Sequence, residues 1–461
     1  MKTIPIAGHS SNLWLNLHSA FRPISFMEGC NKKHGDFYKF IGKDNPSLIM
    51  TSNPQAIKEI LDAPINYFDS GRGNKNLSFL LGDNSLILLD GKAHQHRRRL
   101  LMPAFHGESL KEYSQQIVSI TNEVVNSLTA FGGEPTTAKS FEVRPLMQEI
   151  TLKVMLSIVF GVNSGKRYEK LKELLVKLLE TFNNPLNSLL MFFPVLQKDL
   201  GKYSPWGRFL LLKAEIKEFI YKEIRTRREL IAKGSSTPQD IFGLLLSAKD
   251  EKGEGMSDEE LHDELITLLF AGHETTATAL SWLFYWIHYH PETEAKLREE
   301  ISSLKAISDY KVVNNLSYLN AVILETLRIY PIVSGTFVRI PKQPISILEY
   351  EIEKNDYLSI SIYNLHHRQD LYPNSKQFKP ARFLDKKYSS YEYLPFGGGN
   401  RRCLGYALAL LEMKLIATTI LSRFQLALTS DRQLYPQRRG ITLAPPSFKM
   451  IVKQNEEPAL K

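Results

Sequence analysis

Apolar residues recur at helical spacing through most of the chain. Between residues 107 and 180 they return at i, i+3 and i+4, for example at Leu152, Met155, Leu156 and Val159. This spacing places them on one face of a helix, where they can pack together. The pattern predicts a mainly α-helical fold built around buried helix faces.

The longest apolar run, residues 265–287, follows a capping box of Ser-Asp-Glu-Glu at residues 257–260. Its only ionisable residues are His273, Glu274 and Tyr285. The run is long enough to cross a bilayer, but a carboxylate near its middle is costly in lipid. We therefore expect a long helix that is buried through the core of a soluble protein.

Alternating apolar positions predict a small β region beside the helices. Residues 37–41 and 48–50 have the composition of short strands, and Asn53-Pro54 opens a predicted helix that ends at Leu61. The N-terminal strands and residues from about 336 to 362 are expected to form this β region. Further strands are expected as a hairpin over residues 345–362 with its turn at Asn355-Asp356, and over residues 441–443 and 448–452.

Composition narrows the class of protein. The 461 residues are 43% hydrophobic and 23% charged, which suffices for a sizeable core. We see no linker and expect a single domain over residues 1–461. The chain begins with neither a signal peptide nor an anchor of about 20 apolar residues, so we expect a cytoplasmic monomer. The net charge is +9, yet no Lys/Arg block suggests a nucleic-acid tail, so a partner with an acidic face is favoured.

The sequence contains only two cysteines, Cys30 and Cys403, and therefore no secreted disulfide framework. Cys403 follows the glycine-rich residues 396–402 and precedes an apolar run without proline, residues 404–421, which predicts a helix. A helix start and two adjacent arginines should make this cysteine lose its proton easily. A thiolate in a tight loop beside a large flat ligand can hold a haem iron. The alternative is a buried cysteine in a glycine-rich turn.

The spacing Phe-x-x-Gly-x-Arg-x-Cys-x-Gly, from Phe396 to Gly405, resembles the haem-thiolate signature of the cytochrome P450 family. The overall pattern is most similar to soluble bacterial, and in particular cyanobacterial, members. The resemblance implies the cytochrome P450 fold, mainly α with a small β subdomain, and haem b as cofactor. It makes Cys403 the metal ligand and places Phe396 and Arg401 at the cofactor.

Three more residues resemble the family's contacts to the haem propionates. His94 and Arg98 lie four apart and share a helix face. Alone, this pair would indicate a solvated basic helix end. In the family, an aromatic residue or His followed by Arg at this place contacts one propionate. Arg339, in the strand-like residues 336–340, is expected to contact the second.

Residues 271–276, Ala-Gly-His-Glu-Thr-Thr, resemble the family's oxygen-activation motif. Gly272 leaves room for a ligand to lie against the helix, and Thr275 can turn its hydroxyl toward that gap. Glu274 can relay protons from outside, so Glu274 and Thr275 are the predicted catalytic residues. The His-Glu pair also begins a zinc-protease motif, but Ala277 stands where that motif requires a second His.

Glu325 and Arg328 lie three apart on a predicted helix and are surrounded by apolar residues. An isolated pair of this kind is usually a surface salt bridge of small value. The family has Glu-x-x-Arg here, locked to an arginine of a later Pro-x-Arg-Phe motif. That residue is Arg382, so the resemblance implies a buried structural triad.

An apolar stretch broken by prolines, residues 181–205, predicts a mobile lid or a membrane-grazing loop; plain core is the alternative. The family's substrate-entrance helices fall in this stretch. A lipophilic substrate pocket is expected from the loop 71–86, residues 182–196, Leu268, Ala271 and the turn Pro446-Ser447-Phe448.

The resemblance implies a monooxygenase that inserts one oxygen atom of O2 into a lipophilic substrate such as a fatty acid or terpenoid. The residues after Cys403 are too few for a reductase domain, so electrons should come from a separate acidic protein, a ferredoxin or flavodoxin. Lys92, Arg99 and Arg402 are expected to form its docking face. The alternatives are a peroxide-dependent haem-thiolate enzyme and a non-catalytic haem-binding protein, neither of which explains Glu274-Thr275 as well.

Overall fold

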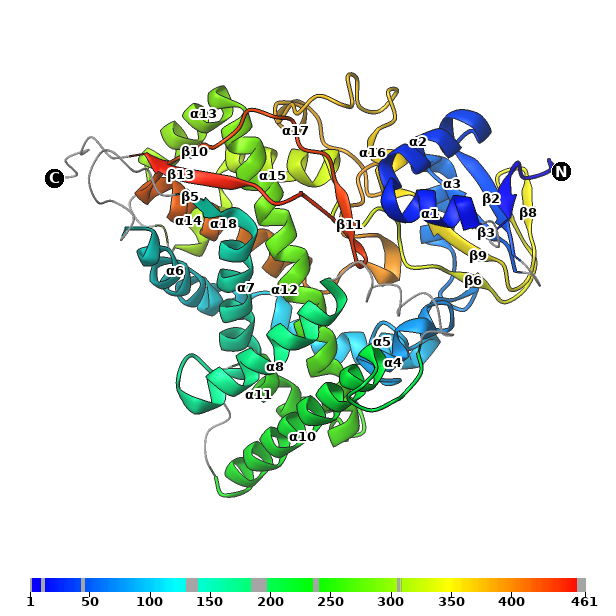
Figure 1. The fold of residues 1–461 in the computed structure, drawn as a ribbon. Coiled ribbons are helices and arrows are strands. Elements are labelled where there is room, and N and C mark those ends of the chain that lie inside the picture. Colours follow the sequence, from blue (N-terminus) through cyan, green and yellow to red (C-terminus); the bar gives the residue numbers. More distant parts are fainter. Residues whose placement is uncertain are drawn as a thin grey trace.

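The computed structural model describes residues 2–9, 13–42, 46–129, 140–183, 197–234, 240–304, 307 and 309–453. Most helices gather on one side of the molecule, and the N-terminal strands form a sheet on the other (Figure 1). The prediction of a mainly helical protein with a small β part is confirmed.

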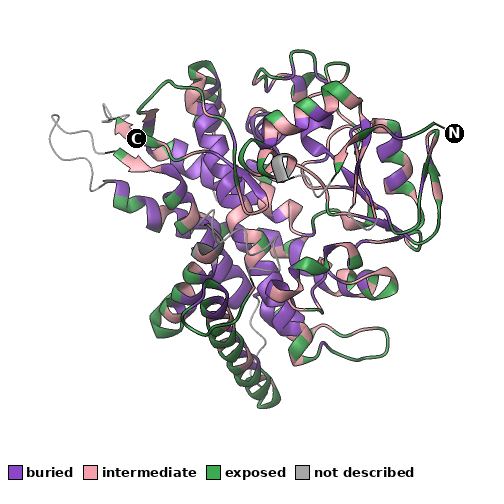
Figure 2. Ribbon diagram, turned by 45° about the vertical axis from the view of Figure 1, so that its right-hand side comes forward, coloured by how far each residue is buried: buried purple, intermediate pink, exposed green. Residues whose placement is uncertain are grey.

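Helix α12 (Asp258–Tyr289) runs through the centre of the helical part and is buried along most of its length (Figures 1 and 2). Ser257 caps it, and the predicted capping box with Glu260 is present. Its main neighbour is α7 (Val143–Phe160), which is itself buried on nearly all sides. The predicted long buried helix is thus confirmed, and it is the axis on which the other helices pack.

Helix α18 (Tyr406–Arg423) confirms the helix expected after Cys403. It packs on α6 (Glu108–Thr129), on α12 and on α15 (Ser317–Ile329). Because α18 contacts these helices, the loop that precedes it is fixed to the core.

The four-stranded sheet has the order β1 (Ile6–His9), β2 (Phe37–Ile41), β3 (Leu48–Thr51), β9 (Tyr357–Ile360). Strands β2 and β3 are antiparallel, whereas β9 joins β3 in parallel. The next element, α3 (Pro54–Asp62), starts where it was expected because Asn53 Oδ1 accepts hydrogen bonds from the backbone of Gln55 and Ala56.

The predicted hairpin turn at Asn355-Asp356 is wrong. The hairpin consists of β7 (Ile345–Ile347) and β8 (Tyr350–Ile352), with Leu348 at φ 52° in its turn. Residues after β8 leave the hairpin because β9 pairs with β3, where Tyr357 lies opposite Leu48. Alternation predicted the strands here, but the partner of the last strand is 309 residues away in sequence.

Near the C-terminus, β10 (Gln425–Leu428), β13 (Lys449–Lys453) and β5 (Ser140–Glu142) form a three-stranded sheet. A separate hairpin joins β11 (Gln437–Arg439) to β12 (Thr442–Ala444). The strands expected at 441–443 and 448–452 are therefore present, each displaced by one residue.

The remaining elements are mostly short. Two of them, η1 and α4, fall in the stretch 71–86, which was expected to be a loop. Residues 184–196 of the predicted lid lie outside the described residues. No helix in the described ranges is long and apolar enough to cross a membrane. The other elements are α1 (Leu13–Phe21), α2 (Pro23–His34), β4 (Phe68–Asp69), η1 (Arg72–Leu77), α4 (Ser78–Leu81), α5 (Gly91–Leu101), η2 (Met102–Phe105), α8 (Gly165–Asn183), α10 (Pro205–Ala232), α11 (Ile241–Ser247), α13 (Pro291–Ser302), α14 (Tyr310–Asn314), β6 (Ile340–Pro341), α16 (Ile362–His366), α17 (Arg382–Asp385) and η5 (Gly399–Arg401).

Candidate functional site

Cys403 lies between η5 and the start of α18, in a loop that is closed by a hydrogen bond from its backbone N–H to the Phe396 carbonyl (2.9 Å). Gly399 has φ 63°, and a Cβ there would lie 3.0 Å from the carbonyl oxygen of Leu61 in α3. Gly399 lets this loop pack closely against α3.

The thiol of Cys403 is exposed, although protein atoms surround it closely enough that burial raises its pKa. The backbone of Gly405, Arg98 and Arg402 act in the opposite direction and lower the pKa. The sequence predicted a thiol that loses its proton easily. In the structure, desolvation raises the pKa of the thiol by more than the helix start and the arginines lower it.

Three nitrogen-bearing side chains near this loop lack anionic partners in the described part of the chain. His94 is 2% exposed, and its Nδ1 has no hydrogen-bond partner. Arg339 is 5% exposed, and its guanidinium donates only to the Gly398 carbonyl, at 3.3 Å. Burial lowers the pKa of His94 to about 3 and that of Arg339 to about 10, and the positive charge of Arg401 adds to both shifts.

Arg98 completes this group of side chains. Burial lowers its pKa, and the thiol of Cys403 raises it, so the guanidinium and the sulfur are electrostatic neighbours. Buried guanidinium groups that lie near other positive charges require an anion to be stable. A flat ligand with two carboxylates, placed against the Cys403 sulfur, would supply it. The residues of this site therefore fit a haem, and Arg98, His94 and Arg339 would hold its two propionates.

Arg401 has a different partner. Its guanidinium pairs with Asp90 (2.9 Å) and donates to the Leu89 carbonyl (2.6 Å). Asp90 also accepts from the backbone N–H groups of Ser70, Gly71 and Arg72, at 2.7 to 2.8 Å. The structure therefore shows Arg401 tying the Cys403 loop to residues 70–72. Sequence reasoning missed Asp90, which lies 311 positions from Arg401.

The middle of α12 is less buried than the turns on either side of it. In a helix that is otherwise mainly buried, Ala271 is exposed and Thr275 is half-buried, while Leu268, one turn earlier, is 9% exposed. The Thr275 hydroxyl donates to the Ala271 carbonyl at 2.5 Å. The side of α12 that carries Ala271 and Thr275 is therefore open, and we call the space beside it the hollow.

Gly272 does not face that hollow. A Cβ at this position would lie 2.6 Å from Cε of Met155 on α7. The expectation that Gly272 makes room for a ligand is wrong, because its missing side chain makes room for α7. Next to it, His273 contacts Thr151 of α7 (Nδ1 to Oγ1, 2.8 Å), and burial lowers its pKa to about 3, so it is neutral.

Glu274 lies at the meeting point of three elements. Arg144 of α7 forms an ion pair with its Oε1, and Gln148 Nε2 donates to its Oε2 at 2.9 Å. Arg439 of β11 is a further electrostatic neighbour of both Glu274 and Arg144. The Nε of Arg439 is buried and has no hydrogen-bond partner among the described residues. The same holds for Nε and Nη1 of Arg144. No local sequence signal pointed to Arg144, Gln148 or Arg439, because each reaches Glu274 from a distant segment.

The structure brings Glu325, Arg328 and Arg382 together. Glu325 is fully buried and accepts from Arg328 (2.6 and 2.9 Å) and from Arg382 (3.0 Å). The backbone N–H of Lys379 also donates to it, at 2.7 Å. Arg328 donates to the His366 carbonyl (2.8 Å), so the triad fastens α15 to the irregular chain that leads to Cys403.

The family model for cytochrome P450 matches residues 4–452. The chain belongs to the cytochrome P450 family. A putative cytochrome P450 135B1 from Mycobacterium tuberculosis is 33% identical over 422 residues, which cover 92% of this chain and 85% of that protein. A putative cytochrome P450 138 from Mycobacterium bovis is 30% identical over 439 residues, covering 94% and 93%. P450 enzymes are haem monooxygenases, so the predicted class of oxidoreductase is confirmed.

Solved P450 structures share the fold. Retinoic acid-bound cyanobacterial CYP120A1 superimposes with a TM-score of 0.82 at 24% identity, covering 98% of this chain and all of that one. The haem domain of cytochrome P450DA superimposes with a TM-score of 0.83 at 23% identity, covering 98% of both chains. The predicted P450 fold is thereby confirmed.

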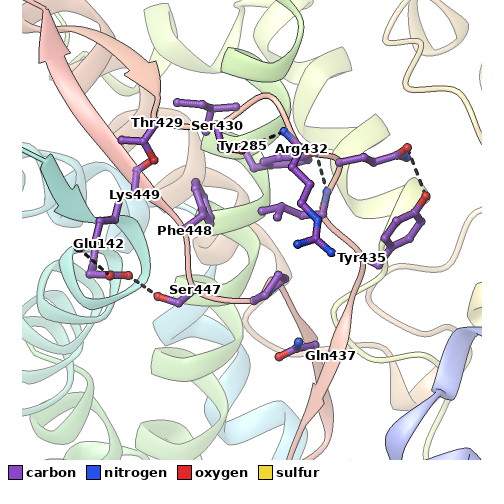
Figure 3. Close-up of a pocket in the computed structure, with 14 residues that line it drawn as sticks. Glu142, Tyr285, Thr429, Ser430, Arg432, Tyr435, Gln437, Ser447, Phe448 and Lys449 are labelled. Atoms are coloured by element: carbon purple, nitrogen blue, oxygen red, sulfur yellow. Dashed lines mark hydrogen bonds and ion pairs between the residues drawn. The ribbon is translucent and has the colours of Figure 1, made fainter.

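Phe448 does not lie beside Ala271 in this P450. Its ring packs edge-on against Tyr285 (5.8 Å between centroids), near the C-terminal end of α12. Tyr285 is 14 residues beyond Ala271, or roughly 20 Å along the helix. Phe448 and Ser447 line a separate pocket of about 550 Å³ between β10 and the turn before β13 (Figure 3). The sequence placed Phe448 in the substrate pocket because its turn is apolar. An apolar turn could line either hollow, so this signal could not distinguish them.

The predicted docking residues of this P450 differ in their surroundings. Lys92 and Arg402 are exposed, and the Arg402 guanidinium lies 3.8 Å from the centre of the Tyr406 ring. Arg99 is also exposed but pairs with Glu251 at 3.0 Å. Asp250 lies 3.9 Å from His96 on the same helix, so residues 250–251 add negative charge to this face of α5.

Proposed function

We propose that this P450 inserts one oxygen atom of O2 into a lipophilic substrate of the fatty acid or terpenoid class. The second oxygen atom leaves as water. Haem b is the cofactor, and the two electrons come from a separate acidic electron-transfer protein, a ferredoxin or a flavodoxin. The observation that carries the proposal is the group of His94, Arg98 and Arg339 beside the Cys403 loop, which lack anionic partners in the described part of the chain.

Cys403 holds the haem iron, and Arg98, His94 and Arg339 hold the propionates. When bound, the haem supplies the iron at which O2 is reduced, and a thiolate ligand favours O–O cleavage. Arg98 and Arg402 stabilise the thiolate by their positive charges. The hydrogen bond from Cys403 N–H to Phe396 fixes the direction in which the sulfur points.

Glu274 and Thr275 move protons at the hollow. The Thr275 hydroxyl, held by the Ala271 carbonyl, is exposed to the hollow and can hydrogen-bond to oxygen there. Glu274 lies on the adjacent side of the helix, toward α7, where Arg144 and Gln148 hold both carboxylate oxygens. To pass a proton to Thr275, the carboxylate has to turn from α7 toward the hollow. Arg144 and Gln148 therefore fix the position from which that movement starts.

The substrate class follows from the apolar residues beside that turn. Ala271 presents only hydrocarbon to the hollow and the buried Leu268 lies one turn away, which suits a site that buries an apolar molecule. The cyanobacterial structure with the same fold carries retinoic acid, an isoprenoid carboxylic acid. We therefore include isoprenoid acids among the compounds to test.

The test has two parts. The first is a screen of fatty acids, terpenoids and isoprenoid acids for a substrate-induced shift of the Soret band. The second compares product formation with a ferredoxin or flavodoxin, its reductase and NAD(P)H against formation with hydrogen peroxide alone. Equal or better activity with peroxide would favour the peroxide-dependent alternative, and binding without either activity would favour a non-catalytic haem protein.

Cys403→Ser tests the ligand itself. The ferrous carbonyl complex of the wild type should show the red-shifted Soret band of thiolate ligation, and the variant should lose it. Cys30→Ser is the matched control, because Cys30 is a buried thiol in α2. Retention of the red-shifted band in Cys403→Ser would remove Cys403 from the iron.

A further inference from the structure

The pocket beside Phe448 is built from four separate segments of the chain. Tyr285 of α12 forms its base, and the Leu434 backbone N–H donates to the Tyr285 hydroxyl at 3.0 Å. The Phe448 ring packs edge-on against Tyr285, and Ser447 donates to Glu142 of β5. Because these contacts fix each wall to its neighbour, the pocket of about 550 Å³ is preformed. This volume is in the range of small-molecule sites.

The pocket is distinct from the oxygenation site. Tyr285 lies ten residues beyond Thr275 on α12, which is roughly 15 Å along the helix axis. Its other walls come from residues 428–437 and 446–449. None of the residues that hold Glu274, the propionates or the sulfur lines it.

The charges of the pocket are unbalanced. Arg432 extends into the opening between Phe448 and Tyr435 (Figure 3). In the described part of the chain its guanidinium has no carboxylate partner. Glu142, the one acidic residue of the lining, is engaged by Ser447 and by Lys449, whose Nζ lies 3.8 Å from it. One cation therefore faces the pocket without an anion.

We propose that this pocket binds a small amphiphile with an aromatic body and one carboxylate. The carboxylate would accept two parallel hydrogen bonds from Arg432, the geometry in which guanidinium and carboxylate pair best. The ring would lie against Phe448 and the exposed Tyr435, whose faces and edges suit an aromatic partner. This second site does not depend on the oxygenation chemistry or on the substrate of the haem site.

The experiment uses the haem-loaded protein with its iron saturated by 1-phenylimidazole, so that the oxygenation site is closed. Isothermal titration at low salt with 4-phenylbutyrate should show one binding event. Arg432→Gln should weaken it about tenfold or more, as expected for the loss of a hydrogen bond to a charged group. Phe448→Ala should also weaken it, because it removes an aromatic wall.

Arg225→Gln, at an exposed position of α10, is the matched control and should bind like the wild type. The neutral analogue 4-phenyl-1-butanol should bind the wild type at least about tenfold more weakly than 4-phenylbutyrate does. Its affinity for Arg432→Gln should equal its affinity for the wild type. All variants should keep the ferrous carbonyl spectrum of the wild type, which shows that they are folded. Absence of binding to the wild type, or equal affinity of wild type and Arg432→Gln for 4-phenylbutyrate, would overturn the proposal.

Discussion

The side-chain amide of Gln148 donates to Glu274 Oε2 at 2.9 Å, while Arg144, four residues earlier on α7, pairs with Oε1. Both oxygens of the predicted proton-relay acid are thus held by a neighbouring helix. The position of the acid depends on α7 as much as on its own helix. This relationship could not be foreseen from residues 271–276 alone.

Arg144→Gln should therefore disturb proton delivery without disturbing substrate binding. Without its charged partner, Glu274 loses its fixed position, and a larger share of the NAD(P)H consumed should appear as peroxide. Glu274→Gln removes the acid itself and should slow product formation by about 10²-fold or more. The measurements are NAD(P)H, product and peroxide in the same reaction. Lys177→Gln, which breaks the surface pair with Glu173, is the control; unchanged coupling in Arg144→Gln would contradict the role.

Thr275→Ala tests the second member of the proton path. The substitution removes the hydroxyl that is exposed to the hollow but keeps the helix, since Ala is the best helix former. Substrate should still shift the Soret band, whereas most reducing equivalents should be lost as peroxide. Thr276→Ala is the neighbouring control, because Thr276 is 4% exposed. A Thr275→Ala protein that couples fully would exclude the hydroxyl from the mechanism.

Glu325→Gln should destabilise the protein strongly. It leaves the buried guanidinium groups of Arg328 and Arg382 without an anion, and breaking such a pair costs about 3–5 kcal/mol. That is a large part of a typical stability of about 5–15 kcal/mol. We expect a low ratio of Soret to protein absorbance and a lower Tm. Asp385→Asn, at an exposed position just after Arg382, should change neither; a normal haem yield in Glu325→Gln would refute the structural role.

Acid should destabilise the fold through its buried histidines. Burial lowers the pKa of His273 and of His366 to about 3, below the ordinary value of about 6.5. As the pH falls below about 6.5, the unfolded chain binds protons that the folded chain does not. Each histidine therefore removes about 1.4 kcal/mol of stability per pH unit from about 6.5 down to about 3. Above a pH of about 6.5 the histidine is neutral in both the folded and the unfolded chain, so it no longer lowers the stability.

Urea unfolding at several pH values checks this. His273→Gln should lose stability less steeply than the wild type as the pH falls. The difference in slope should correspond to about one fewer proton bound on unfolding. His96→Gln, at a partly exposed position of α5, should follow the wild type. Parallel curves for all three proteins would show that His273 is not neutral in the fold.

Electron delivery should slow as salt rises, since charges are screened over about 10 Å at 0.1 M ionic strength. Arg402→Glu should have a larger effect than Arg99→Glu, because Glu251 already neutralises part of the Arg99 charge. The measurement is the rate of haem reduction against ionic strength, with Arg225→Glu as the control for net charge. A flat salt profile, or no effect of Arg402→Glu, would place the docking face elsewhere.

Local signals predicted the elements that carry the site. The capping box and uninterrupted apolar run of α12, the Asn53 cap of α3 and the apolar run after Cys403 each act within a few turns of helix. The errors arose where distant segments meet. The pairing of β9 with β3, the Asp90–Arg401 pair and the packing of Gly272 on Met155 depend on residues more than a hundred positions apart, which no local pattern encodes.

The contact between Gly272 and Met155 lies on the side of α12 away from the hollow. The absent side chain of Gly272 and the flexible thioether of Met155 determine how closely α12 and α7 approach. A shorter residue at 155 would let α12 settle deeper, and a branched one would press it outward. Substitutions at position 155 would thus alter the dimensions of the cavity from behind its wall, while every residue that meets the substrate stays the same.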